Sequence, residues 1–235
     1  MLFRSRVTLF LTHGHWDHVL GRPWWPEAST LAHDRFAGDL RRDRETILRE
    51  AEAMAVKHGE RWARGFEPFG PDLAVSGLKF LRLDPWRLVL RDAPGHSASQ
   101  LTCHLTDRDV LLAADMLSDI EPPMLDGPCA PYRETLEALV VLAEHGAIET
   151  LVPGHGAIAA GDQAVLARFH GDLDYLRALE RGVSRAVERG LALADAEESL
   201  AAMDYTGKDS ATYPTEPIHR DNIRLAYEGV MELRR

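Results

Sequence analysis

Thr12-His13-Gly14-His15-Trp16-Asp17-His18 is the most informative stretch of this 235-residue chain. It directly follows an apolar run, residues 7–11, whose β-branched and aromatic side chains predict a buried strand. If the extended backbone continues, His13 and His15 point to the same side, and Asp17 and His18 follow on a turn. Imidazole is the commonest metal ligand at neutral pH, and mixed histidine and carboxylate ligation suits Zn²⁺ or a similar ion. The stretch therefore predicts a metal site.

Three further segments each place one histidine or aspartate at the end of an apolar, strand-like run. They are Ala93-Pro94-Gly95-His96-Ser97, Leu111-Leu112-Ala113-Ala114-Asp115 and Leu151-Val152-Pro153-Gly154-His155-Gly156. In layered α/β folds, functional side chains gather where strands lead into loops. Together the four segments supply five histidines and two carboxylates, enough for two metal ions with one shared ligand.

The order and spacing of these residues resemble the metallo-β-lactamase superfamily, whose pattern is HxHxDH followed by a lone histidine, a lone aspartate and a final histidine. The resemblance covers roughly residues 5–160, and the separations between positions 96, 115 and 155 are similar to the glyoxalase II and lactonase-like branches. It implies an α/β (α+β) fold, namely a four-layer αββα sandwich with a helical C-terminal extension.

The family pattern also implies a ligand set. The ligands of the first ion are His13, His15 and His96. Those of the second ion are Asp17, His18 and His155, and Asp115 bridges both ions. The resemblance implies two Zn²⁺ per chain, with iron or manganese as alternatives. Two ions about 3.5–4 Å apart lower the pKa of a bridging water toward neutrality, so that no serine or cysteine nucleophile is required.

The implied activity is a metal-dependent hydrolase. A hydroxide bridging two metal ions cleaves an ester, thioester, lactone or similar acyl bond of a small molecule, with Asp17 as the catalytic residue that anchors the second ion. Two alternatives stay open. The first is a mononuclear-iron persulfide dioxygenase, which keeps the same seven residues but loads iron on His13, His96 and Asp115 alone. The second is a non-catalytic, truncated relic that keeps its ligands but holds no substrate pocket.

Three other polar residues are expected near the substrate. Ser118 follows Asp115 closely and is expected to line the pocket. Tyr132 is expected to donate a hydrogen bond to a substrate oxyanion, as a tyrosine does in related lactonases. His219 begins the last predicted helix and is a candidate substrate contact at the pocket mouth, although polar residues at helix starts are usually caps or surface groups. The remaining histidines lack a ligand-like context and are expected to be structural: His33, His58, His104, His145 and His170.

Composition limits the class of partner. The net charge of −10 disfavours nucleic-acid binding, which needs clustered lysine and arginine. The sequence shows no secretory signal and no apolar run near the ~20 residues of a membrane span. Two cysteines, Cys103 and Cys129, are too few for a secreted disulfide framework. We therefore expect a cytoplasmic protein that acts on a small molecule and binds neither nucleic acid nor membrane.

Hydrophobic periodicity predicts the order of elements. Strands are expected at 28–33, 79–83, 86–91, 100–105, 109–114 and 149–152, and helices at 34–64, 132–144, 162–189, 192–203 and 217–233. Residues 1–160 are expected to form the catalytic domain, with a helical insert at about 34–70, and residues 161–235 a helical extension packed on the same domain. Four aromatic residues of the insert region are expected either to form a lid over the metals or to pack the insert onto the sheet: Trp24, Trp25, Trp62 and Phe66.

The segment ahead of the HxHxDH motif is short. Relatives in the superfamily place several strands there, whereas this sequence supplies only about a dozen residues. Either the start site lies inside a longer gene, or the chain covers the exposed edge by other means. We expect an incomplete first sheet and, because open sheet edges and uncovered apolar faces favour association, a homodimer or poor solubility.

Overall fold

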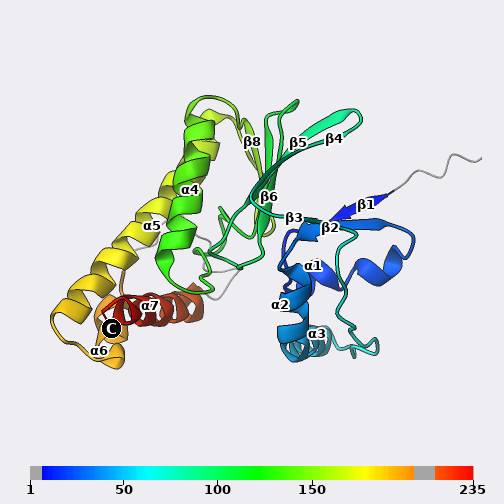
Figure 1. Ribbon diagram of the computed structural model, residues 1–235. Helices are drawn as coiled ribbons and strands as arrows, with labels where there is room; N and C mark the ends of the chain where they lie inside the picture. Colours follow the sequence, from blue (N-terminus) through cyan, green and yellow to red (C-terminus); the bar gives the residue numbers. More distant parts are fainter. Residues whose placement is uncertain (1–6, 204–214, 235) are drawn as a thin grey trace, which may run out of the picture.

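The computed structural model describes residues 7–203 and 215–234, which form a four-layer αββα arrangement with two β-sheets at its centre (Figure 1). The first sheet is parallel, with the order β1-β2-β3. Its strands are β1 (Thr8–Phe10), β2 (Ser29–His33) and β3 (Leu73–Val75). The second sheet has six strands in the order β4 to β9. They are β4 (Leu78–Leu83), β5 (Trp86–Asp92), β6 (Leu101–Leu105), β7 (Val110–Ala114), β8 (Thr150–Pro153) and β9 (Ala159–Ala160).

The helices that follow the first metal-binding motif cover the outer face of the first sheet. They are α1 (Trp16–Val19), α2 (Phe36–Arg42) and α3 (Arg44–Lys57), with a short 3-10 helix, η1, at Arg22–Trp24 (Figure 1). The expected turn at Asp17 and His18 is instead the single-turn helix α1. The expected continuous helix at 34–64 is wrong in extent, because the chain breaks between α2 and α3 at Asp43 and the helix ends at Lys57. Gly59 follows that end with a φ of 74°, a conformation that favours glycine at helix ends.

The second half of the chain contributes α4 (Cys129–Glu144), α5 (Asp162–Glu188), α6 (Leu193–Leu200) and α7 (Thr215–Glu232). Of these, α4 and α5 cover the other sheet, whereas α6 and α7 pack on α5 (Figure 1). These helices and the predicted strands agree with the sequence expectations to within about three residues at each end, the usual uncertainty of a boundary. Two short strands, β3 and β9, were not predicted, because two or three residues are too few to show an alternating pattern; β1 is equally short but lies within a longer apolar run.

Three apolar clusters lie between the four layers. The helices α1 to α3 pack on the first sheet through a cluster that includes Ala32, Phe36 and Leu40. The two sheets pack on each other through Leu31, Val75, Leu90, Leu101 and Cys103. The largest cluster joins the second sheet to α4, α5 and α7, and includes Leu111, Leu136, Phe169 and Ile223. Neighbouring residues of one strand, Leu31 and Ala32, serve different clusters, as the period of two in a strand requires.

The first sheet leaves part of the second one uncovered. Among the described residues, β1 is hydrogen-bonded to a strand on one side only. The pairs Leu81–Leu88 and Leu83–Trp86 of the β4–β5 hairpin lie on the face that turns toward the first sheet. At the end of the hairpin, however, Leu83 is 43% exposed and Trp86 is 38% exposed. Among the described residues, the three strands of the first sheet therefore leave this end of the hairpin partly exposed. None of the helices within residues 7–203 and 215–234 has the length and apolar character to span a membrane.

Candidate metal centre

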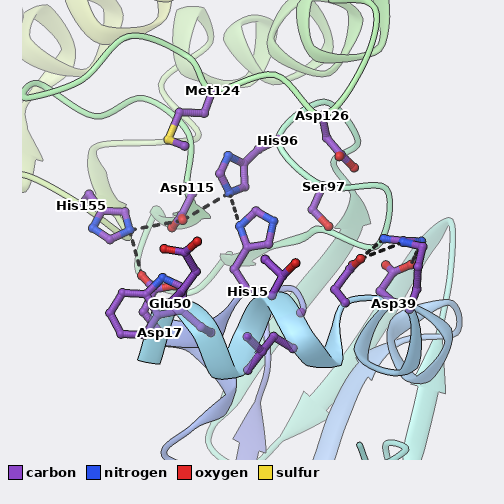
Figure 2. A pocket seen from close by; sticks show the side chains of 16 residues that line it. His15, Asp17, Asp39, Glu50, His96, Ser97, Asp115, Met124, Asp126 and His155 are labelled. Carbon is purple, nitrogen blue, oxygen red and sulfur yellow. Dashed lines mark hydrogen bonds and ion pairs between the residues drawn. The ribbon is translucent and has the colours of Figure 1, made fainter. Parts of the chain in front are cut away.

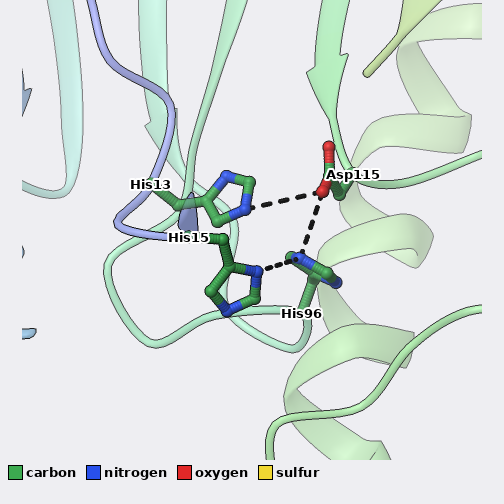
Figure 3. A group of neighbouring side chains, drawn as sticks. All are labelled: His13, His15, His96 and Asp115. Carbon is green, nitrogen blue, oxygen red and sulfur yellow. Dashed lines mark hydrogen bonds and ion pairs between the residues drawn. The ribbon is translucent and has the colours of Figure 1, made fainter. Parts of the chain in front are cut away.

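Four loops bring the predicted ligands together at one edge of the two sheets. The first group comprises His13, His15, His96 and Asp115, whose ligand atoms lie within 4.8 Å of one another (Figure 3). The two histidines of the motif follow β1, while His96 follows β5 and Asp115 follows β7. His96 Nε2 lies 3.0 Å from His15 Nδ1 and 3.3 Å from Asp115 Oδ2.

The second group shares Asp115 with the first. Its other members are Asp17, His18 and His155, and all four ligand atoms again lie within 4.8 Å of one another. Asp17 and His18 lie on α1, and His155 follows β8. His155 Nε2 lies 3.2 Å from Asp17 Oδ2 and 3.2 Å from Asp115 Oδ2 (Figure 2). The structure therefore brings together all seven residues of the implied ligand set.

Asp115 lies between the two groups. His96 and His13 approach its Oδ2 from the first group, at 3.3 Å and 3.5 Å. His18 Nε2, from the second group, lies 3.1 Å from Oδ1. Asp115 therefore has histidines of both groups around its carboxylate, and His18 and His155 also lie 3.2 Å from Oδ2.

The buried donors of the centre fit a metal. The side chain of His13 is fully buried, and its Nε2 has no hydrogen-bond partner among the described residues. A buried polar atom without a partner is costly and rare, so this nitrogen needs a group that the protein itself does not supply. Imidazole nitrogens and carboxylate oxygens in this number suit Zn²⁺ and similar first-row ions. The residues present therefore fit the metal that the sequence pattern implies.

The electrostatics of the site separate the histidines into two kinds. Burial, together with the nearby His96, lowers the pKa of His13 well below its usual value and that of His15 to about 4. These imidazoles are therefore neutral, the form that binds metal. Hydrogen bonds to Asp115 and then Asp17 raise the pKa of His155 to about 10. Burial opposes the charge of Asp115, but hydrogen bonds from His155, His18 and His96 outweigh it and hold the pKa of that carboxyl far below its usual value.

Two glycines allow the ligand loops to approach their neighbours closely. A side chain at Gly95 would overlap the backbone and Cβ of Tyr132, and its φ of 135° is strained for any other residue. A side chain at Gly154 would overlap the Oδ1 of Asp115. The close approach of each loop to its neighbour thus explains why a glycine precedes His96 and His155.

Several residues that support the loops were not singled out from the sequence. Gln100 is buried and joins two ligand loops, since its amide donates to the Ala93 carbonyl at 3.2 Å and its Oε1 accepts from the Asp115 N–H at 3.4 Å. Arg168 donates to the carbonyls of Leu117 and Ala157, which follow Asp115 and His155 in the sequence by two residues each. A glutamine at a strand start and an arginine on a helix carry no signal in sequence that distinguishes them from surface residues.

The three residues expected to touch substrate lie elsewhere. Tyr132 is fully buried and donates its hydroxyl to the backbone carbonyl of Asp115 at 3.2 Å. His219 is buried among the C-terminal helices, where its ring nitrogens lie 2.9 Å from the Tyr175 hydroxyl and 2.9 Å from the Leu200 carbonyl. Ser118 is buried, and its hydroxyl accepts from the Ile120 N–H. None of the three is among the residues that line the cavity at the ligands, and their direct contact with substrate stays a prediction.

A cavity of about 770 Å³ opens beside the two ligand groups (Figure 2). Its lining includes His15, Asp17, His96, Asp115 and His155. The rest comes from the helices of the insert, Trp16 and the segments around Ser97 and Met124. The insert aromatics do not form its lid. Trp24 and Trp25 are 56% and 51% exposed, Trp62 and Phe66 pack with the helices α2 and α3, and none of these four lines the cavity.

Comparison with known proteins agrees with this geometry. The family model of the metallo-beta-lactamase superfamily matches residues 7–155. Acyl-coenzyme A thioesterase MBLAC2 from Homo sapiens is 27% identical over 166 residues, which make up 65% of this chain and 57% of that protein. The chain thus spans about half the length of the curated relatives that it matches.

Two solved structures share the fold at low sequence identity. The sec-alkylsulfatase Pisa1 from Pseudomonas sp. has a TM-score of 0.72 at 14% identity, over 97% of this chain and 42% of that one. A metallo-beta-lactamase family protein from Thermus thermophilus has a TM-score of 0.61 at 22% identity, over 94% of this chain and 73% of that one. The family match, the αββα layers and the seven converging side chains lead to one conclusion: the chain belongs to the metallo-beta-lactamase superfamily.

Proposed function

We propose that this protein is a binuclear, zinc-dependent hydrolase that cleaves an ester, thioester, lactone or similar acyl bond of a small molecule. The observation that carries the proposal is the position of Asp115, whose carboxylate belongs to two ligand groups at once. A single tetrahedral site uses four ligands, whereas seven residues converge here. Two sites with one shared carboxylate use all of them.

When bound, the metal ions would lower the pKa of water toward neutrality and polarise the carbonyl oxygen of the substrate. The residues of the chain supply the geometry. His13, His15 and His96 would hold the first ion, and Asp17, His18 and His155 the second. Tyr132 bonds to the backbone carbonyl of Asp115 and Gln100 bonds to its N–H, so that the carboxylate stays directed at both groups.

The names of the curated relatives favour an acyl bond as the target, and the cavity favours a catalytic protein. The curated relatives, at 27% identity, carry the name acyl-coenzyme A thioesterase. The cavity of about 770 Å³ beside the ligands has room for a small organic molecule, which argues against the non-catalytic alternative. Hydrolysis without a covalent acyl-enzyme is favoured because the converging ligand groups can supply a metal-activated hydroxide, so no serine nucleophile is needed.

Metal content is the first test. Protein purified without added metal is expected to hold about two transition-metal ions per chain by elemental analysis, because each ligand group is complete. His18→Ala and His155→Ala are expected to lower that number. His170→Ala is the matched control, since His170 is exposed on α5 and belongs to neither group. One ion per chain, unchanged by His18→Ala and His155→Ala, would favour the mononuclear-iron dioxygenase instead.

Substrate turnover is the second test. A chromogenic ester, a lactone and a glutathione thioester are assayed with Zn²⁺, Mn²⁺ and Fe²⁺ added to protein stripped by a chelator. Hydrolysis of at least one, restored by metal and absent from the stripped protein, is the expected result. Full metal occupancy without hydrolysis of any acyl substrate would contradict the proposed activity while leaving the metal site intact.

A further inference from the structure

A buried asparagine of the last helix holds the loop that contributes Met124 to the cavity. Asn222 lies on α7 and is only 1% exposed. Its Oδ1 accepts from the Leu125 N–H at 3.0 Å, and its Nδ2 donates to the Pro123 carbonyl at 2.6 Å and to the Tyr175 hydroxyl at 2.8 Å. Two of these three bonds therefore go to the backbone on either side of Met124.

The partners of Asn222 require a carboxamide. Leu125 offers a donor and Pro123 an acceptor, so the side chain must present an oxygen to one and an N–H to the other. An aspartate would place a second oxygen against the Pro123 carbonyl, and an alanine would leave both backbone groups without this bond. Because a buried backbone group that loses its partner costs free energy, Asn222 fixes the position of the loop.

The same loop is also tied to one of the ligand loops. The Asp126 N–H donates to the Gly95 carbonyl at 2.8 Å, and Gly95 directly precedes a candidate ligand. Farther along, α7 approaches Pro128 closely, since a Cβ at Gly229 would lie 3.0 Å from the proline ring. Asn222 and Gly229 are about two helical turns apart, so they lie on the same face of α7. The loop thus lies between this face of α7 and a ligand loop of the metal centre.

Met124 presents an apolar side chain at the ligand groups. It is half-buried, and it lines the cavity together with two other apolar side chains, Trp16 and Ile47. Ile47 is only 2% exposed and offers little surface to a ligand. In Figure 2, Met124 lies on the opposite side of the ligands from the helix of the insert. The flexible and polarizable thioether of methionine adapts to apolar groups of different shape.

We propose that Met124 contacts the apolar acyl chain of the substrate and that Asn222, from the C-terminal helix, positions it there. This inference rests on the proposed function and deepens it, since it names the residue that distinguishes long from short acyl chains. Met124 is the specificity-determining residue, because its side chain lines the cavity. Asn222 is a positioning residue, because it acts through the backbone of the loop. The contact is apolar and does not depend on the charge of the carboxylates or of the metal ions.

Two chromogenic esters, p-nitrophenyl hexanoate and p-nitrophenyl acetate, test the role of Met124. The parent protein is expected to have the higher kcat/KM for the hexanoate. Met124→Ala is expected to lower the hexanoate-to-acetate ratio of kcat/KM by about four- to fifteenfold, the equivalent of one or two methylene groups of apolar contact. Met124→Leu is expected to keep most of the ratio, because leucine is apolar and of similar volume. An unchanged ratio in Met124→Ala would overturn the assignment.

A double-mutant cycle tests the role of Asn222. Asn222→Ala is expected to lower the same ratio in the parent and to have no further effect in Met124→Ala, because it acts through Met124. Tyr227→Phe is the matched control, since Tyr227 lies on the same helix but donates to the Leu191 carbonyl, at 2.8 Å, outside the loop. An equal loss in both backgrounds, or the same loss in Tyr227→Phe, would overturn the positioning role.

Two further measurements keep this test decisive. Metal content is determined for each variant, so that a change of ratio is not confused with a loss of metal. If Asn222→Ala does not fold, Asn222→Asp is measured in its place, because it keeps the acceptor of the amide and loses only the donor. Its ratio is expected to fall as well, and an unchanged ratio would overturn the positioning role.

A binding measurement separates this inference from the proposed function. The methionine methyl groups are isotope-labelled for NMR, and the Met124 signal is identified by its loss in Met124→Leu. Titration with hexanamide, a neutral acyl compound, is expected to shift this signal. The dissociation constant is expected to rise by about four- to fifteenfold in Asn222→Ala and to stay unchanged in Tyr227→Phe. Such binding without hydrolysis of either ester would support this inference and contradict the proposed function. Hydrolysis of the esters with no shift of the Met124 signal would support the function and overturn this inference.

Discussion

Gly154→Ala places one methyl group against the shared carboxylate of the metal centre. The new Cβ would overlap Asp115 Oδ1 and lie 3.3 Å from the Ala114 carbonyl oxygen. The loop cannot easily move away, because the Gly154 N–H donates to that same carbonyl at 2.7 Å. The carboxylate must therefore shift, and it belongs to both ligand groups.

The size of the effect follows from that shift. Asp115 Oδ1 must retreat by more than about 1 Å to restore ordinary contact, and a misplacement of about 1 Å at a reacting centre costs on the order of 10²-fold in turnover. Disturbance of a ligand's orientation costs about 10- to 100-fold in metal affinity. Overpacking lowers the free energy of unfolding by about 1–3 kcal/mol, which lowers the Tm by roughly 2–4 °C per kcal/mol in a chain of this size.

Gly38→Ala is the matched control. Gly38 lies within α2, where an added methyl meets nothing within 4 Å, so the same chemical change should stabilise the helix by about 0.5–1 kcal/mol. Elemental analysis after dialysis, ester turnover and thermal melting are measured for both variants. If Gly154→Ala kept the metal content and turnover of the parent, the close approach of this loop to Asp115 would not matter for the site, and the reasoning would be refuted.

Three further predictions follow from the site and the sheets. Tyr132→Phe should lower the free energy of unfolding by about 1 kcal/mol and leave KM unchanged, because the hydroxyl bonds to the Asp115 backbone; a raised KM would indicate contact with substrate. Asp17→Asn should reduce turnover by several orders of magnitude, as expected when a ligand of the second ion is lost. Ser97→Ala and Ser118→Ala should reduce turnover far less. A serine variant that is as inactive as Asp17→Asn while its metals stay bound would point to covalent catalysis. The edge of β1 that pairs with no strand within the described residues and the exposed end of the β4–β5 hairpin predict a homodimer or poor solubility, and a well-behaved monomer throughout a light-scattering dilution series would contradict this.

The sequence by itself was enough for the residues of the candidate metal centre and for most elements. The strands and the long helices are short-range patterns, because a period of two or of 3.6 is already present in ten to twenty neighbouring residues. The seven candidate ligands could be singled out because each has a distinctive local context, either the HxHxDH motif or the end of an apolar run. The residues that the structure brings within 4.8 Å in each group are the ones that these contexts indicate.

The surroundings of the ligands depended on tertiary structure. Tyr132, Ser118 and His219 are near a ligand or at a helix start in sequence, yet packing leaves the first two outside the cavity lining and buries the third between helices. Conversely, Asp39 and Glu50 look like surface charges of an insert helix, and only the packing of that helix beside the cavity gives them a place at the site. A ligand is marked by its own neighbours along the chain. Whether a residue lines the cavity depends instead on which face of a helix meets a distant loop. This is a long-range property of the packed layers, and no local pattern contains it.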